Sequence, residues 1–228
     1  MKKTILVLAN SVKYGQHCVA GKDIITKNWI RPVSNINGGA LTREQILCKN
    51  PYAYEKFQIK VIQEIEIEFL QKAPLINQPE NFVITDKIWI QQYSYSLSRN
   101  ELDSYLDYPD ILWSNLSSSG RGENDRVNYE QILRKDIIIV QSLYFIKVYN
   151  ATLIIAASFG DNEKKRVRLS FYHKNIHYNL AVTDPAVWGA FINRGTGQYP
   201  FNGEIYLCIS LGQPFNDGFC YKLVATIL

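Results

Sequence analysis

The 228-residue sequence lacks any long apolar run, which excludes the helical type of integral membrane protein. No stretch approaches the roughly 20 apolar residues that a helix needs to cross a bilayer. The opening segment MKKTILVLANS carries two lysines before an apolar run. That run has only about six residues and no small-residue cleavage site follows it, so we expect neither a signal peptide nor a membrane partner.

Cysteine is scarce, and the usual catalytic motifs are missing. Cys18, Cys48, Cys208 and Cys220 lie far apart and form no C-x-x-C pair. This spacing argues against disulfides and zinc, and favours a cytoplasmic location. The sequence contains no Walker loop, G-x-G-x-x-G, H-E-x-x-H or G-x-S-x-G. We therefore predict no metal, no cofactor and no catalytic residue, although missing motifs do not exclude an enzyme.

A strong excess of one charge is also missing, because the net charge is only +4. Its distribution is uneven: 11 Lys/Arg against 6 Asp/Glu in residues 1–75 (net +5), 6 against 9 in residues 76–135 (net −3), and 8 against 6 in residues 136–228 (net +2). Basic ends suit an anionic partner such as nucleic acid or a nucleotide. Ordinary surface charge explains the same numbers, so charge alone decides nothing.

The sequence does contain a dense polar stretch between two expected strands. The run from Thr4 to Ala9 is apolar and rich in β-branched residues, which predicts a buried strand, and Trp29 to Ser34 predicts a second. Asn10, Ser11 and Lys13 follow the first strand, and Arg31 lies in the second. Neutral donors with two cations could hold a phosphate. The alternative is that Asn10 and Ser11 cap a turn while Arg31 packs on Trp29.

Alternation of apolar and polar residues from Phe57 to Phe69 predicts one long strand. Weak helical patterns cover Asp86–Tyr95, Ser98–Leu106 and Val127–Arg134, and the Ser/Gly/Asn-rich stretch Ser114–Arg126 is expected to be a mobile loop. The later strands are expected at Ile137–Tyr149, Thr152–Ser158, Arg166–Tyr172, His177–Val182, Glu204–Leu211 and Phe219–Leu228, with a turn at Asp161-Asn162. Thr183 or Asp184 should cap a helix over Ala186–Asn193.

Many short strands with few helices predict a mainly β protein with minor α content. We expect two OB-like antiparallel β-barrels in tandem. The first covers residues 1–75 and the second residues 136–228. Residues 76–135 form a partly helical, loop-rich connection.

Several segments resemble the dual OB-containing domain family. They are LANSVKYGQHCVAGK with WIRPVS, the triplet Asp125-Arg126-Val127, VTDP at Val182–Pro185, and YLCISLGQPF with YKLVATI near the end. The resemblance runs over essentially the whole chain and implies two OB-like barrels. It also implies a relation to modules of bacterial defence and nucleic-acid-processing systems, and binding of nucleic acid.

Basic and aromatic residues alternate near the middle of the expected second barrel. Tyr172 lies among basic residues and further rings, an arrangement that suits base stacking on an OB surface. Alternate aromatics on strands are more often core, so the two interpretations stay open. His173 and His177 have the spacing of helical metal ligands, but an expected turn at Asn175 removes that meaning.

The leading hypothesis is a non-catalytic module that binds single-stranded RNA or DNA. Lys13, Arg31, Arg126 and Lys222 would contact phosphates, Asn10 and Ser11 would add donors, and Tyr172 would stack on a base. A second hypothesis is a nucleotide or modified-nucleoside pocket at Asn10–Arg31, in a sensor or small-substrate enzyme. A third is an adaptor with a protein partner on the acidic middle segment. The sequence does not specify the ligand or the oligomeric state.

Overall fold

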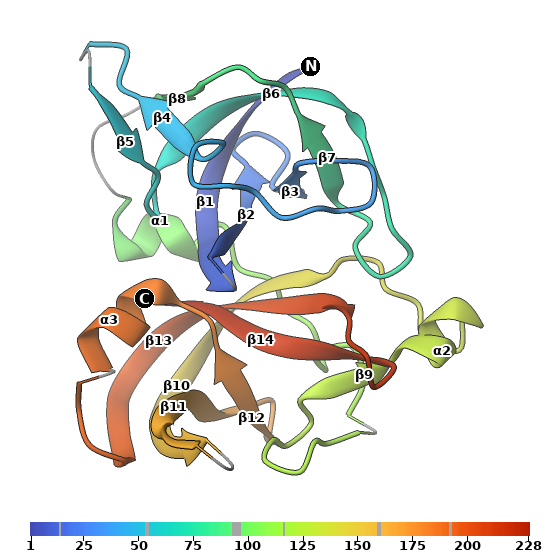
Figure 1. The fold of residues 1–228 in the computed structure, drawn as a ribbon, viewed down its shortest axis with the longest axis vertical. Helices are drawn as coiled ribbons and strands as arrows, with labels where there is room; N and C mark the ends of the chain where they lie inside the picture. Colours follow the sequence, from blue (N-terminus) through green and yellow to red (C-terminus); the bar gives the residue numbers. More distant parts are fainter. Residues whose placement is uncertain (14, 53–54, 93–96, 116, 159–160, 192) are drawn as a thin grey trace. The chain divides into compact units, whose positions relative to one another are not determined.

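The computed structural model describes residues 1–228 except 14, 53–54, 93–96, 116, 159–160 and 192 (Figure 1). Strands hold 53% of the residues and helices 8%, which confirms the mainly β prediction. The chain forms two compact units, Met1–Leu106 and Asp107–Leu228. The boundary falls inside the segment 76–135 that the sequence suggested as a connection. In the described part of the chain, no helix has the length and apolar character that a membrane span requires.

The first unit contains a closed ring of five strands. Its elements are β1 (Lys2–Lys13), β2 (Gln16–Asp23), β3 (Trp29–Val33), β4 (Leu47–Lys49), β5 (Lys56–Gln58), β6 (Glu64–Lys72), β7 (Asn81–Ile84), β8 (Trp89–Gln91) and the short helix α1 (Arg99–Asp103). The ring runs β1-β2-β3-β7-β6 and closes where β6 pairs with β1. Only the β3–β7 pair in this ring is parallel.

The second unit repeats this connectivity. Its elements are β9 (Arg126–Asn128), α2 (Tyr129–Leu133), β10 (Leu143–Ser158), β11 (Asp161–His173), β12 (Ile176–Val182), α3 (Pro185–Phe191), β13 (Gly197–Pro214) and β14 (Phe219–Ile227). The ring runs β12-β11-β10-β13-β14 and closes through a parallel β12–β14 pair. In both rings the first strand lies between the second and fourth, and the third pairs with the fifth. This is a five-stranded Greek-key barrel of OB type, which confirms the tandem prediction.

Each barrel is filled by the inward-facing residues of its strands. Along β11, Val167, Leu169 and Phe171 are buried, whereas the residues between them are at least partly exposed. Tyr178 and Leu180 on β12 continue the same interior cluster. Because side chains alternate between the two faces of a strand, the remaining residues of β11 and β12 form an outer face.

The prediction of one long strand from Phe57 to Phe69 is wrong. The structure places β5 at Lys56–Gln58 and starts β6 only at Glu64. Between them Ile62 adopts φ 66°, and the Gln63 side chain accepts the Lys60 N–H at 2.8 Å. The polar residue that interrupted the alternation is therefore part of a turn, because its amide can satisfy a backbone donor.

Two further expectations need correction. The helix expected over Asp86–Tyr95 is replaced by a turn and by strand β8, and residues 93–95 lie outside the described part. The two strands expected at Ile137–Tyr149 and Thr152–Ser158 form one strand, β10, which starts at Leu143. A register shift between Tyr149 and Ala151 lets β10 continue past Asn150 as a bulge, so the polar residue does not end it.

The cap expected at Asp184 is confirmed, and two further capping arrangements are present. Asp184 Oδ1 accepts the Ala186 N–H at 2.8 Å, at the start of α3. Ser98 caps α1 in a full capping box with Glu101. Thr42 and Gln45 make the same reciprocal pair, although only a turn follows before β4. The expected turn at Asn175 is present with φ 64°.

We predict that Gly21→Ala destabilises the first barrel. A Cβ at Gly21 would lie 2.2 Å from the Leu6 carbonyl oxygen, beside the bulge of β1. Backbone atoms cannot yield as a flexible side chain can, so we expect a loss of about 1–3 kcal/mol in the free energy of unfolding. Chemical denaturation measures it. Gly120→Ala is the matched control, because a Cβ there meets nothing within 4 Å, and equal losses in the two variants would contradict the prediction.

Candidate nucleic-acid interface

OB-type barrels bind ligands on the face of their second and third strands and on the loops after the first and fourth strands. In the first barrel these strands are β2 and β3. All five residues of β3 and the last five of β2 are buried. The polar side chains among them are occupied within the same unit: Lys22 Nζ donates to the Tyr105 carbonyl at 2.7 Å, and Arg31 pairs with Glu80.

Arg31 is held at two points by Glu80. Its backbone N–H donates to the Glu80 carbonyl at 2.9 Å, and its Nε donates to Glu80 Oε1 at 3.1 Å. The two side chains are only 7% and 5% exposed. Glu80 lies in the connection between β6 and β7, which is the loop after the fourth strand. The expected phosphate-binding cation is thus an internal ion-pair partner.

Asn10, Ser11 and Lys13 lie on β1 where it approaches β2. Asn10 Nδ2 donates to the Ile59 carbonyl at 3.0 Å, and its Oδ1 lies 3.0 Å from His17 Nδ1. Ser11 Oγ donates to the Cys18 carbonyl at 3.5 Å. Lys13 is the last residue of β1, and its side chain lies outside the described part. The structure therefore places the three residues beside the loop after the first strand, with both neutral donors bonded inside the barrel.

The corresponding face of the second barrel, on β11 and β12, is partly open. Arg166, Arg168 and Tyr172 of β11 alternate with buried residues and face outward. Tyr172 is 63% exposed, and its ring lies 5.0 Å from that of His177 on β12. The rings of Phe171 and Tyr178 are instead stacked in the interior at 5.6 Å. Of these three aromatics, only Tyr172 is available to a ligand.

Asp125 lies on this face within the Ser/Gly/Asn-rich stretch Ser114–Arg126, and its carboxylate joins Ser119 of that stretch to Arg168 of β11. It is 1% exposed and accepts the backbone N–H and the hydroxyl of Ser119 at 2.7 and 2.6 Å. Arg168 Nη2 donates to Asp125 Oδ2 at 2.9 Å. A Cβ at Gly122 would lie 1.7 Å from that oxygen, so glycine permits the close packing of the loop. Small polar residues of this stretch therefore serve as hydrogen-bonding partners within the fold.

Lys222 lies inside the second barrel. It is fully buried, its Nζ donates to the Ser114 carbonyl, and its ammonium lies 5.2 Å from the centre of the Tyr178 ring. Burial lowers the pKa of Lys222 to about 7, against a smaller opposing effect of Asp125. The side chain predicted to contact a phosphate is therefore buried in the barrel interior.

Arg126 in β9 is half-buried beside the loop between β13 and β14. Its guanidinium lies 3.9 Å from the centre of the Phe219 ring and 3.8 Å from an Asp217 carboxylate oxygen. Its Nε donates to Ser117 Oγ at 2.9 Å. Because that loop follows the fourth strand of the ring, Arg126 borders an edge of the OB ligand surface.

His173 and His177 do not form a pair. His173 is buried with Nε2 2.8 Å from the Pro109 carbonyl, whereas His177 faces outward beside Glu123. Among the described side chains, no group of three metal-ligating residues occurs.

A pocket of about 250 Å³ opens next to Tyr172, which sequence reasoning missed. The residues around it that bear on its chemistry are Asn150, Thr152, Ser170, Tyr172, Phe201 and Asn202. It forms where the bulge at Asn150 meets the irregular register of β10 with β13. A bulge arises from the pairing of two strands, so the sequence of one strand alone does not predict it.

We predict that Glu80→Gln destabilises the protein by about 3–5 kcal/mol, because it leaves the buried Arg31 charge uncompensated. Chemical denaturation measures the loss. The double variant Arg31→Met/Glu80→Leu removes both charges and should lose less than Glu80→Gln. A double variant that is less stable than Glu80→Gln would contradict the prediction that Glu80 acts only by neutralising the charge of Arg31.

Lys222 should make stability depend on pH. The unfolded pKa is near 10.5 and the folded pKa about 7, so between these values the unfolded chain binds a proton that the folded chain does not. Falling pH therefore lowers the free energy of unfolding through this range. We predict that Lys222→Met raises stability at pH 7 by an amount on the order of 4–5 kcal/mol, because each pKa unit between about 7 and 10.5 corresponds to roughly 1.4 kcal/mol.

The gain from Lys222→Met should shrink as the pH rises to 10. Denaturant titrations of both proteins at pH 7, 8.5 and 10 measure this difference, in which the titration of other groups cancels. A gain that stays constant with pH would show that the Lys222 pKa is not lowered.

Comparisons with known proteins identify the family. A family model described as the dual OB-containing domain matches residues 3–227. No curated protein matches the sequence. Among solved structures, a murine DNA binding protein bound with double-stranded DNA aligns with 100% of this chain and 95% of its own, at 12% identity and a TM-score of 0.35. That likeness carries no argument about this chain. Because the family model covers nearly the whole sequence, the protein belongs to the dual OB-containing domain family.

Proposed function

We propose that this protein binds single-stranded nucleic acid through the outer face of β11 and β12 in the second barrel. The observation that carries the proposal is the contrast between the two barrels. The β2–β3 face of the first is buried, and its Arg31 is paired internally. The same face of the second presents an exposed ring at Tyr172 and an exposed cation at Arg166.

The chemistry of the open face suits a single strand. An exposed tyrosine offers a flat surface on which a base of a single strand can stack. An intact duplex does not offer the flat faces of its bases at its sides. Lys174, in the β11–β12 turn, is paired with Asp110, but these side chains are 46% and 93% exposed. Such an exposed pair contributes little stability, so Lys174 can exchange its partner for a phosphate at small cost.

The other predicted contacts divide into two groups. Arg126 lies beside the loop that follows the fourth strand of the second barrel, and it belongs to the proposed interface. Lys13, Asn10 and Ser11 belong to the first barrel, and their contact with a nucleic-acid strand stays a prediction. Arg31 and Lys222 would have to leave the barrel interior to reach a phosphate. We assign them a structural role in the proposal.

A small-ligand function has one specific observation in its favour, the pocket beside Tyr172. A nucleotide or modified nucleoside would then bind at the second barrel, not at Asn10 and Arg31 as the sequence suggested. A single strand with one base seated there would use the same residues. Competition between free nucleotides and an oligonucleotide distinguishes the two functions, because a pocket specific for nucleotides would bind the monomer at least as tightly.

Tyr172→Ala should weaken the binding of single-stranded RNA or DNA by roughly 1–3 kcal/mol, the value of one base–aromatic stack. Fluorescence polarisation with labelled single strands and duplexes, at low and at physiological salt, measures it. Tyr52→Ala is the matched control, since Tyr52 is 94% exposed in the first barrel. Arg166→Ala should reduce the salt dependence by about one counterion, and exposed Arg134→Ala should not. Unchanged affinity of Tyr172→Ala would contradict the proposed face.

A further inference from the structure

Three side chains on the outer face of the second barrel form a continuous hydrogen-bonded row. Ser170 Oγ on β11 lies 2.7 Å from His177 Nε2 on β12, and His177 Nδ1 lies 2.7 Å from Glu123 Oε2. A hydroxyl on one ring nitrogen and a carboxylate on the other is the arrangement by which serine hydrolases activate their nucleophile. Ser170 and His177 are 7 residues apart, whereas Glu123 lies 54 residues before His177, and the three match no short motif.

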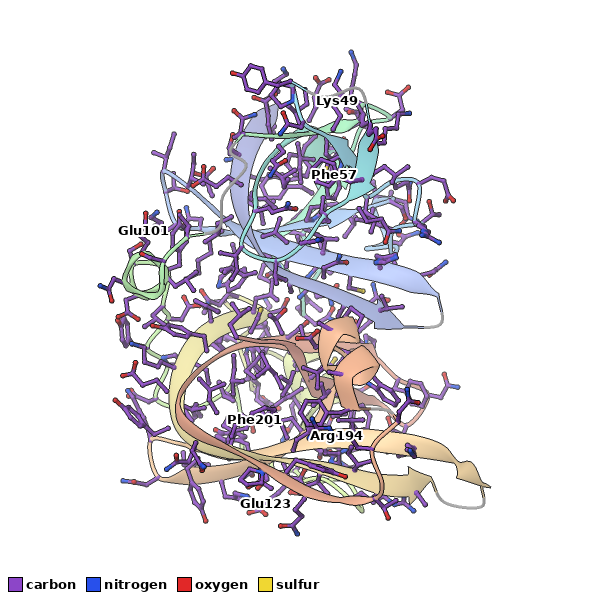
Figure 2. The ribbon with its side chains drawn as sticks, turned by 90° about the vertical axis from the view of Figure 1, so that its left-hand side faces the viewer. Lys49, Phe57, Glu101, Glu123, Arg194 and Phe201 are labelled. Atoms are coloured by element: carbon purple, nitrogen blue, oxygen red, sulfur yellow. The ribbon has the colours of Figure 1, made fainter. Side chains whose placement is uncertain are left out.

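The backbone holds this row in place. Glu123 and Asn179 exchange two backbone hydrogen bonds, of 3.2 and 3.0 Å, which fix Glu123 beside β12. Asn124 Nδ2 donates to the His177 carbonyl at 3.0 Å. The Tyr172 ring lies 5.0 Å from the imidazole and limits its rotation. Figure 2 labels Glu123 on the second unit, together with Phe201 from the nearby pocket. A row held at several points is preorganised for proton transfer.

The partners define the proton positions. A carboxylate only accepts hydrogen bonds, so His177 Nδ1 carries the proton that is donated to Glu123. In the neutral ring Nε2 is then unprotonated and accepts the Ser170 hydroxyl. His177 can therefore take the proton of Ser170, and Glu123 stabilises the imidazolium that results.

The serine also borders a pocket. Ser170 shares the 250 Å³ cavity with Thr152, Phe201 and Asn150, and among the described residues that line it none is charged. This volume is below the roughly 300–1,000 Å³ typical of sites for drug-sized ligands, so it suits a short uncharged group. Asn150, in the bulge with φ 56°, uses its Oδ1 to accept the Gly203 N–H at 2.9 Å.

We propose that Ser170, His177 and Glu123 hydrolyse short, uncharged carboxylic esters. Ser170 Oγ bonds to the carbonyl carbon while its proton passes to His177 Nε2. The bond from that carbon to the alcohol oxygen then breaks, and the alcohol leaves with the proton from His177. His177 next takes a proton from water, which attacks the acyl carbon. Ser170 leaves with that proton, and the net reaction converts ester and water into acid and alcohol.

The test uses the whole 228-residue chain and a small neutral fluorophosphate, diisopropyl fluorophosphate. Ser170 attacks its phosphorus, fluoride leaves, and mass spectrometry of digested protein locates the adduct. We expect labelling at Ser170, lost in Ser170→Ala and slowed by roughly 10²–10⁴-fold in His177→Gln, which removes the base. Ser104→Ala and His17→Gln are matched controls in the first barrel and should be labelled like the wild type. Absence of an adduct at Ser170 would overturn the proposal.

Glu123 is a positioning residue, and its variant separates its electrostatic role from a structural one. Glu123→Gln keeps a hydrogen-bonding side chain but removes the charge. We expect a lower maximal labelling rate at an unchanged concentration for half-maximal rate, with an unchanged unfolding midpoint. Equal labelling rates in Glu123→Gln and wild type would refute the role of Glu123. p-Nitrophenyl acetate hydrolysis should follow the same order of variants. No nucleic acid enters these assays, and so their outcome is independent of strand binding.

Discussion

A parallel pair joins the third and fifth strands in each barrel, and in the second barrel this pair completes the ring on which the outer face depends. The contact is short: Ala181 and Val182 of β12 pair with Leu223 and Val224 of β14. Asp184 extends it, because its Oδ1 caps α3 while its Oδ2 accepts the Ile227 N–H of β14 at 2.9 Å. One buried carboxylate thus ends a strand, starts a helix and joins the closing strand. The ring fixes which residues of β11 and β12 point inward. The remaining residues of these strands point outward, where a ligand can contact them.

The two barrels share a topology but use the same face differently. In the first, the loop after the fourth strand supplies Glu80, which neutralises Arg31 and closes the face. In the second, Asp125 neutralises Arg168, yet Tyr172 and Arg166 stay exposed, and Glu123 lies beside His177. The first barrel therefore has a closed face at this position, and the second has a partly open one. Function belongs to the surface and not to the fold.

Sequence patterns were sufficient for the barrels but not for the site. Period-two alternation and the cap at Asp184 are local signals, and the structure has that cap. The polar stretch around Arg31 looked like a ligand site because it contains a cation and donors, but its partner Glu80 is 49 residues away. The sequence did not predict the hydrogen-bonded row of Ser170, His177 and Glu123 for the same reason, because Glu123 lies in a loop 54 residues before His177. Long-range pairing decides whether a polar residue is available to a ligand, and no single segment encodes it.

Hydrogen–deuterium exchange with and without a saturating single-stranded oligonucleotide tests the central claim most directly. We predict new protection from exchange in β11, β12 and the turn at Lys174. The exchange of β2 and β3 should stay unchanged, because they are already buried. Protection confined to the first barrel, with β11 and β12 exchanging as in the free protein, would contradict it.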